Sequence, residues 1–168
     1  MTSATRYRTY RGFSLIELVI VVVIIAIIGA IAIPRMSRGA SGAGDSALIQ
    51  NLAVLRTAID LYATEHGNVY PAVGDLKNHL TMYSDASGGT VAATKDAATG
   101  VIYGPYLRQV PPLPVGRNKG GTDFIAAFAE PNAGVPSGGW IYNATTGAVT
   151  ANTTTDEKDE ALKLYSDY

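Results

Sequence analysis

One carboxylate, Glu17, lies inside the longest apolar stretch of the chain, and it is the side chain that most needs a chemical explanation. The stretch covers residues 13–33 and reads FSLIELVIVVVIIAIIGAIAI, with Glu17 as its single charge. A charge placed in a lipid bilayer costs about 2 to 3 kcal/mol or more, so such residues usually carry a function. Gly12 and Phe13 form the junction between this stretch and a basic leader. We interpret Gly12, Phe13 and Glu17 as the candidate functional residues.

Other combinations of reactive side chains do not predict a catalytic site. The chain has two histidines, His66 and His79, and no cysteine, so the ligand spacing of a zinc site is missing. No Gly-x-Ser-x-Gly motif supports a serine nucleophile. The Gly-Gly pairs at 88–89, 120–121 and 138–139 lack the strand–loop–helix setting of phosphate-binding loops. We therefore expect no enzymatic activity.

Four acidic residues near the carboxyl end are the remaining candidates for metal binding. They are Asp156, Glu157, Asp159 and Glu160. Calcium needs several oxygen ligands that converge from a shaped loop. A run of acids next to Ala161 and Leu162 is more typical of the solvated start of a helix, which is how we interpret it.

The charge distribution argues against a nucleic-acid-binding surface. The chain has 13 basic and 14 acidic residues, for a formal net charge of −1. Arg6, Arg8 and Arg11 lie in the leader, so the remaining residues carry 10 bases against 14 acids, or about −4. A surface that binds phosphates would need a basic patch, and the sequence offers none. The absence of cysteine is compatible with export, and it means that the domain is held together by packing or by assembly.

The apolar stretch is long enough to cross a membrane as a helix. At about 1.5 Å per residue, its 21 residues span roughly 30 Å, the thickness of the hydrocarbon core of a bilayer. The leader has more arginines than the other flank, which has Arg35 and Arg38, so the amino terminus is predicted in the cytoplasm. Pro34 is expected to kink or end the helix. The Gly-rich segment after it leaves a flexible tether and a continued helix as alternatives.

An amphipathic helix is predicted from Asp45 to His66. Asp45 or Ser46 can cap its start, and Gly67 is placed to end it. Its apolar positions recur at three- and four-residue steps, as expected for one buried face. They are Leu48, Ile49, Leu52, Leu55, Ile59 and Tyr62.

The remaining sequence predicts a small mixed domain. Leu76, Leu80 and Tyr83 suggest a short helix, residues 84–100 an exposed loop, and the prolines of 104–114 a segment without regular structure. Strand signals follow at Asp123–Glu130 and in a hairpin over 140–151, beneath which Trp140 is expected to close the core. The tail is expected to form a helical turn around Ala161, Leu162 and Leu164.

The amino-terminal segment resembles the signature of type IV pilin-like prepilins. The matching residues are Arg11-Gly12-Phe13-Ser14-Leu15-Ile16-Glu17-Leu18, followed by the apolar run. The resemblance implies that a prepilin peptidase cuts after Gly12 and methylates the new amino terminus at Phe13. It also implies that Glu17 of one subunit pairs with the Phe13 amine of a neighbour when the helices pack into a filament. The implied fold is α+β and pilin-like, with a long amino-terminal hydrophobic helix packed against a small carboxyl-terminal antiparallel sheet.

Within that family, the chain is most similar to the major pseudopilins of type II secretion systems. The segment 61–71, LYATEHGNVYP, and the Gly-Trp-x-Tyr-Asn pattern of 139–143 carry this similarity. Many type IV pilins close a carboxyl-terminal disulfide loop, which a chain without cysteine cannot form. Major pseudopilins often hold calcium in a late loop of spaced aspartates and serines. That pattern is not seen between Pro111 and Gly139, so no cofactor is predicted and calcium stays an open alternative.

The resulting prediction is a structural filament subunit of a type II secretion-type pseudopilus. Residues 1–12 would form the leader, 13–34 the transmembrane and assembly helix, 35–44 a Gly-rich connector and 45–168 an extracytoplasmic domain in a single-pass protein of the bacterial inner membrane. The implied partners are prepilin peptidase, like subunits in a homopolymer, and indirectly an inner-membrane assembly platform and a cytoplasmic ATPase.

Three other interpretations stay open. The first is a type IV pilin for adhesion, motility or DNA uptake. The second is a membrane-anchored binding domain or enzyme that never polymerises, in which Glu17 reaches toward the lipid headgroups. The third is an ordinary secreted domain cut after Ala32, although the apolar stretch is longer than the roughly 7 to 15 residues of a secretory signal.

Overall fold

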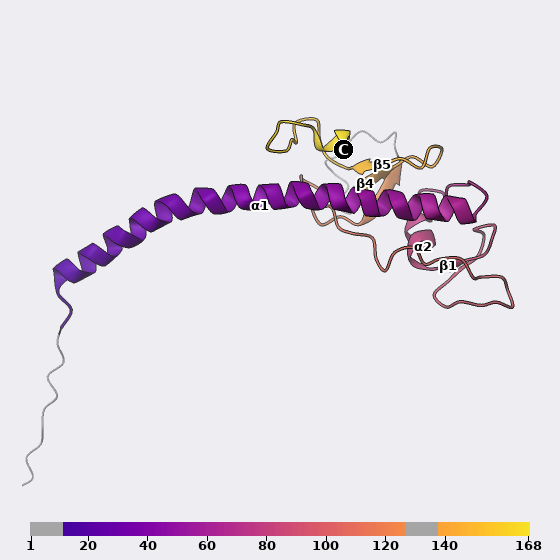
Figure 1. Ribbon diagram of the computed structural model, residues 1–168, viewed down its shortest axis with the longest axis horizontal. Helices are drawn as coiled ribbons and strands as arrows, with labels where there is room; N and C mark the ends of the chain where they lie inside the picture. Colours follow the sequence, from indigo (N-terminus) through magenta and orange to yellow (C-terminus); the bar gives the residue numbers. More distant parts are fainter. Residues whose placement is uncertain (1–11, 127–137) are drawn as a thin grey trace, which may run out of the picture. The chain divides into compact units, whose positions relative to one another are not determined.

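The fold combines one long helix with two small sheets (Figure 1). The computed structural model describes residues 12–126 and 138–168, without the side chains of residues 31–40. Its elements are α1 (Leu15–Glu65), α2 (Leu76–Thr81), β1 (Tyr83–Ser84), β2 (Val91–Ala92), β3 (Asp123–Ala126), β4 (Gly138–Tyr142), β5 (Val149–Ala151) and the 3₁₀ helix η1 (Tyr165–Asp167). The chain forms two compact units, Met1–Ala40 and Ser41–Tyr168. The predicted α+β fold class is confirmed.

Helix α1 runs through the Gly-rich segment 35–44, for which the sequence left a tether and a helix as alternatives. Pro34 does not end the helix, although a proline removes one backbone hydrogen bond. The predicted cap at Asp45 or Ser46 is wrong, because the helix already begins at Leu15. Both residues lie in its interior.

Packing explains one of the glycines in that segment. A Cβ atom on Gly44 would lie 3.2 Å from Cγ1 of Val115 and 3.7 Å from the carbonyl oxygen of Pro114. The missing side chain therefore lets the segment around Val115 approach the helix closely. Such contacts offset the roughly 1 kcal/mol that a glycine costs in a helix relative to alanine.

The buried face of α1 forms the centre of the core of the unit Ser41–Tyr168. The predicted stripe is confirmed at five positions and wrong at Ile49, whose side chain is 51% exposed. Successive helical residues are rotated by about 100°, so Ile49 lies well off the face that Leu48 and Leu52 share. The buried members of the stripe are Leu48, Leu52, Leu55, Ile59 and Tyr62.

The helix ends where the sequence predicts. Gly67 has a φ of 67°, the left-handed conformation that favours glycine at this position, and Asn68 N donates a hydrogen bond of 2.7 Å to the Ala63 carbonyl. Helix α2 follows and confirms the predicted short helix at Leu76 and Leu80, whereas Tyr83, the third residue of that prediction, lies in β1. Leu76 and Leu80 are both fully buried against the same core.

The three-stranded sheet contains the predicted hairpin. Strands β4 and β5 pair antiparallel, with Trp140 opposite Ala151. Strand β3 pairs with β4 in parallel, so the sheet is mixed and differs in this pair from the antiparallel sheet that was expected. The predicted strand Asp123–Glu130 is confirmed over 123–126, and its remainder lies outside the described residues.

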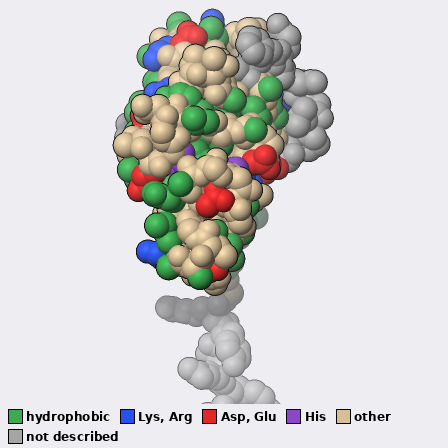
Figure 2. All heavy atoms as spheres, turned by 90° about the vertical axis from the view of Figure 1, so that its right-hand side faces the viewer, with side chains coloured by type: hydrophobic (Ala, Val, Ile, Leu, Met, Phe, Trp, Pro, Cys, Tyr) green, Lys and Arg blue, Asp and Glu red, His purple; other side chains and the backbone are tan. Residues whose placement is uncertain are grey.

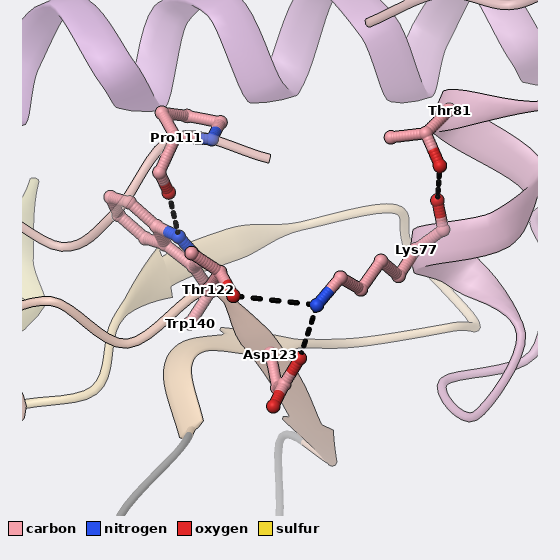
Figure 3. A network of polar contacts seen from close by, with 6 residues as sticks. All are labelled: Lys77, Thr81, Pro111, Thr122, Asp123 and Trp140. Carbon is pink, nitrogen blue, oxygen red and sulfur yellow. Dashed lines mark hydrogen bonds and ion pairs between the residues drawn. The ribbon is translucent and has the colours of Figure 1, made fainter. Parts of the chain in front are cut away.

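Trp140 closes the core beneath the hairpin, as predicted. Its side chain is fully buried, and its indole Nε1 donates a 2.9 Å hydrogen bond to the Pro111 carbonyl (Figure 3). Figure 3 also shows Lys77 of α2 reaching toward β3, where its Nζ lies 2.7 Å from Asp123 Oδ1. This ion pair is half exposed on both sides, so it contributes at most about 1 kcal/mol.

Two loop predictions need correction. The segment 84–100 is not entirely loop, because β1 at its start pairs antiparallel with β2 in its middle. The expected helical turn around Ala161 and Leu162 is absent from the tail. Its helical residues lie later, in η1, while Leu162 has a φ of 65° that no right-handed helix contains. The acidic run is therefore not the start of a helix.

Candidate functional site

Glu17 closes the first turn of α1. Its Oε2 accepts a 3.0 Å hydrogen bond from the backbone N–H of Ser14, the residue before the helix, while Leu18 N donates to the Ser14 carbonyl at 3.2 Å. Ser14 and Glu17 have the Ser-x-x-Glu spacing in which the acid satisfies a free N–H group at a helix start. A carboxylate at this end also interacts favourably with the helix dipole.

The capping role of Glu17 toward the Ser14 N–H was missed by the sequence analysis, although its signal was readable. Ser14-Leu15-Ile16-Glu17 directly precedes an apolar run, which is the recognised pattern of a helix start. The Glu17 carboxylate caps the helix, and from the same position it points toward the amino-terminal end of the chain.

The three predicted site residues lie together at this end. Phe13 immediately precedes Ser14, and its side chain is 81% exposed. In the uncut chain Phe13 has an ordinary peptide N–H, so the partner within hydrogen-bond distance of Glu17 is the Ser14 N–H and not an amine. A cut after Gly12 would place a positive amino group one residue from the group that Glu17 already binds.

Gly12 has no contact that would require a glycine. A Cβ atom built on it meets nothing within 4 Å, and its φ lies outside the left-handed range. The arginines of the leader, which were expected to guide orientation, lie outside the described residues.

The helix around Glu17 exposes an unusually large apolar surface. Its large apolar side chains between Phe13 and Ile28 are between 44% and 81% exposed. Exposed apolar surface of this extent is typical of a partner or membrane contact. Within the described part of the chain, no helix is both long and apolar enough to count as a membrane span.

The histidines take part in packing. His66 stacks on Tyr62 with ring centroids 3.8 Å apart, and its Nε2 lies 3.0 Å from the Asp85 carbonyl oxygen. His79 Nε2 lies 2.7 Å from the Gly88 carbonyl oxygen. Both side chains are more than nine-tenths buried, and histidine occupies only small areas of the face in Figure 2. They hold the turn that contains Asp85 and Gly88 against the helices.

Two of the four acidic residues of the tail, Glu157 and Asp159, accept hydrogen bonds within the domain. Glu157 accepts from the backbone N–H groups of Arg117 at 2.5 Å and Thr154 at 2.8 Å, and Asp159 accepts from Lys163 N at 2.8 Å. The hydroxyl of Tyr168 also donates to Asp159 and lowers the pKa of that carboxyl. In the part of the chain that the structure describes, no three acidic or histidine side chains converge as metal ligands.

A calcium ion does not fit the one place where buried oxygens remain unpaired. Asn152 Oδ1, Thr153 Oγ1 and Thr154 Oγ1 are buried and have no hydrogen-bond partner among the described residues. The carboxylate beside them, Glu157, already uses both oxygens on backbone N–H groups. Calcium takes 6 to 8 oxygen ligands, usually with several carboxylates among them.

Comparison with known proteins gives one finding. Residues 7–33 match the family model described as the prokaryotic N-terminal methylation motif. No curated protein and no solved structure matches the chain. The match includes Gly12, Phe13 and Glu17 and covers the amino-terminal segment. It supports a membrane-anchored prepilin of the type IV pilin kind, implies processing by a prepilin peptidase and polymerisation with pilin-like subunits, and indicates a structural subunit rather than an enzyme.

Proposed function

We propose that this chain is a pseudopilin, a structural subunit of a type II secretion-type pseudopilus. The position of Glu17 is the observation that carries the proposal. Its carboxylate lies in the first turn of a helix whose apolar side chains are unpartnered, and it faces the place where a cut after Gly12 would create an amine. Methylation of Phe13 keeps that amine positively charged, so it can still pair with a carboxylate.

The mechanism of assembly follows from the cost of burying charge. When apolar helices pack together, water is excluded and an unpaired carboxylate or amine becomes expensive. Pairing Glu17 of one subunit with the Phe13 amine of its neighbour neutralises both groups and sets the register between subunits. Gly29 fits this packing, because a Cβ atom there meets nothing within 4 Å inside the chain and its absence lets another helix approach.

The membrane supplies the subunits for this polymer. We place the leader in the cytoplasm, residues 13–34 in the inner membrane and the unit Ser41–Tyr168 outside it. Prepilin peptidase would cut the leader, and an assembly platform driven by a cytoplasmic ATPase would extract the helix into the filament. The lack of cysteine and the similarity of 61–71 to major pseudopilins favour a pseudopilus over a type IV pilus.

The test separates the charge of Glu17 from its capping bond. Glu17→Gln keeps an acceptor for the Ser14 N–H but carries no charge, whereas Glu17→Ala removes both. We expect both variants to be cut after Gly12 and to form at least tenfold less filament in the fraction sheared from cells. Filament formation by Glu17→Gln at the level of the unmodified chain would show that capping is sufficient and would contradict the charge pair.

A further inference from the structure

Leu162 is exposed to solvent and has a backbone conformation that is unfavourable for leucine. Its side chain is 77% exposed and its φ is 65°, a value that a bulky residue seldom adopts. Both features work against the stability of an isolated domain, since burial of a leucine and a relaxed backbone are each favourable. A strained, exposed apolar residue therefore needs a reason outside the isolated chain.

The turn that carries Leu162 is fixed by its own hydrogen bonds. Leu162 N donates to the Asp159 carbonyl at 3.1 Å, and Asp159 N donates to the Lys163 carbonyl at 2.9 Å. Asp159 Oδ1 accepts from Lys163 N at 2.8 Å, and the Lys163 ammonium lies 3.6 Å from the ring centroid of Tyr168. We call the residues 159–163 the carboxyl-terminal turn, and Leu162 is presented on it in a defined position.

An apolar groove lies elsewhere on the same unit. It has a volume of about 320 Å³, opens to solvent, and is lined by Ala53, Val54, Thr57, Ala58, Leu61, Tyr106 and Leu107. Val54 and Leu61 are each 48% exposed. The wall at Tyr106 is anchored, because its hydroxyl donates a 2.6 Å hydrogen bond to Glu65 Oε2. Burial of Tyr106 raises the pKa of its hydroxyl, which stays protonated and keeps donating at physiological pH.

The carboxyl-terminal turn and the groove lie at different positions along the axis of α1. The carboxyl-terminal turn meets α1 near Asp45, where Glu160 N lies 3.5 Å from Asp45 Oδ2. The groove is centred near Thr57, twelve residues on, which is about 18 Å along a helix. A contact between two different surfaces of the same chain is heterologous, and when it does not close on itself it repeats into an open filament.

Charges beside the two surfaces are complementary. Glu160 lies two residues before Leu162, and Arg108 directly follows Leu107 of the groove; both side chains are exposed. The one ion pair among the described residues joins Lys77 to Asp123, so Glu160 and Arg108 have no ion-pair partner in that part of the chain. Opposite charges next to an apolar contact favour one orientation of the partner.

We propose that Leu162 of one subunit inserts into the groove of the next subunit, with Glu160 of the first beside Arg108 of the second. The inference rests on the proposed function as a filament subunit. It adds a contact between the folded domains to the one that the amino-terminal helices make, and it names a second copy of this chain as the occupant of the groove.

Cysteine cross-linking in the full chain tests this contact directly. The chain has no cysteine, so the double variant Leu162→Cys with Thr57→Cys contains just the two thiols of interest. Val69 is also exposed and apolar, at 62%, but belongs to neither surface, so Val69→Cys with Thr57→Cys is the matched control. Under mild oxidation of cells that assemble the filament, we expect a ladder of cross-linked subunits at least tenfold stronger for the Leu162 pair. Equal yields from the two pairs would overturn the proposal.

A second variant keeps the turn and removes the apolar side chain. Asparagine is close to leucine in size and adopts positive φ more readily, so Leu162→Asn should leave the melting temperature unchanged or raise it. We expect it to reduce sheared filament at least tenfold, while Val69→Asn leaves the amount unchanged. Filament formation by Leu162→Asn at the normal level would overturn the inference and leave the proposed function intact.

A charge exchange tests the orientation. Glu160→Arg and Arg108→Glu should each lower filament yield, and the double variant should restore it by at least half. Failure of the double variant to exceed either single one would contradict the pairing. The amino-terminal peptide is read in every sample. An unmodified chain that is never cut at Gly12 and never polymerises would contradict the proposed function, and the inference would fall with it.

Discussion

Backbone contact at Gly139 leaves no room for a side chain. A Cβ atom there would lie 2.1 Å from the Gly121 carbonyl oxygen, a distance that requires the backbone to move. Overpacking of this kind costs about 1 to 3 kcal/mol. We expect Gly139→Ala to lower the free energy of unfolding by that amount in urea titrations. Gly74→Ala is the control, because its Cβ meets nothing within 4 Å, and an equal loss in both variants would contradict the argument.

The turn after β1 depends on one ionised carboxylate. Asp85 Oδ1 accepts from the Ser87 hydroxyl at 2.6 Å and from the backbone N–H groups of Ser87 at 2.9 Å and Gly89 at 3.1 Å. The side-chain hydrogen bonds from Ser87 and Thr90, with these backbone N–H groups, lower the pKa of Asp85 to about 2. The ordinary value is near 4. Because the folded value is the lower one, this stabilisation is complete above about pH 4 and is lost as the pH falls toward 2.

Amide exchange measures the effect of Asp85 on that turn. Protection of the Gly89 N–H should fall between about pH 4 and about pH 2, after correction for the intrinsic exchange rate. In Asp85→Asn the protection should be weak at every pH. Asp156→Asn serves as the control and should behave as the unmodified chain does. If protection of the Gly89 N–H changed neither with pH nor in Asp85→Asn, the turn would be held by other contacts.

The sequence reveals a residue that stands out by its side-chain type, but it does not reveal a residue whose contacts depend on the conformation of a turn. Glu17 could be singled out as a candidate because a single charge in an apolar run is visible in the sequence itself. The group of donors around Asp85 exists only when residues 85–90 adopt one particular turn. The same holds for Leu162, whose exposure follows from a positive φ that the sequence does not announce.

At the scale of elements, the carboxyl-terminal half of α1 can be tested through its buried face. Leu52 is 1% exposed and lies in the core with Trp140, whereas Ile49 on the same helix is 51% exposed. Leu52→Ala should cost about 2 to 5 kcal/mol of unfolding free energy. Ile49→Ala should cost less than about 1 kcal/mol, since surface substitutions have small effects. Equal losses in thermal and urea unfolding would contradict the assignment of the buried face.

Elements with a strong local signal were predicted correctly. The three- and four-residue repeat located the buried stripe of α1, Gly67 located its end, and the hairpin turn located β4 and β5. The start of the helix was misplaced because aspartate and serine are common capping residues, and Asp45 and Ser46 precede the apolar stripe. The sequence does not reveal that the helix already begins at Leu15. The parallel pairing of β3 depends on a neighbour distant in sequence, which no local pattern encodes.

At the scale of the whole molecule, the two units differ in how far their apolar side chains are exposed to solvent. The unit Ser41–Tyr168 buries its apolar side chains in a core of its own, including Leu48, Trp140 and Tyr142. The large apolar side chains from Phe13 to Ile28 are not covered by the part of the chain that the structure describes. Exposed apolar surface of this extent is typical of a membrane or partner contact, and the proposed assembly would provide both in turn.

Processing at Gly12 decides between this account and its alternatives, and it is read from the intact mass and amino-terminal peptide of the protein isolated from native membranes. We expect a chain that begins at Phe13 with a methylated amine. A retained Met1 or Thr2 would indicate an uncut anchor and would contradict it. A chain that begins after Ala32 would indicate an ordinary secreted domain, and the filament proposal would have to be abandoned.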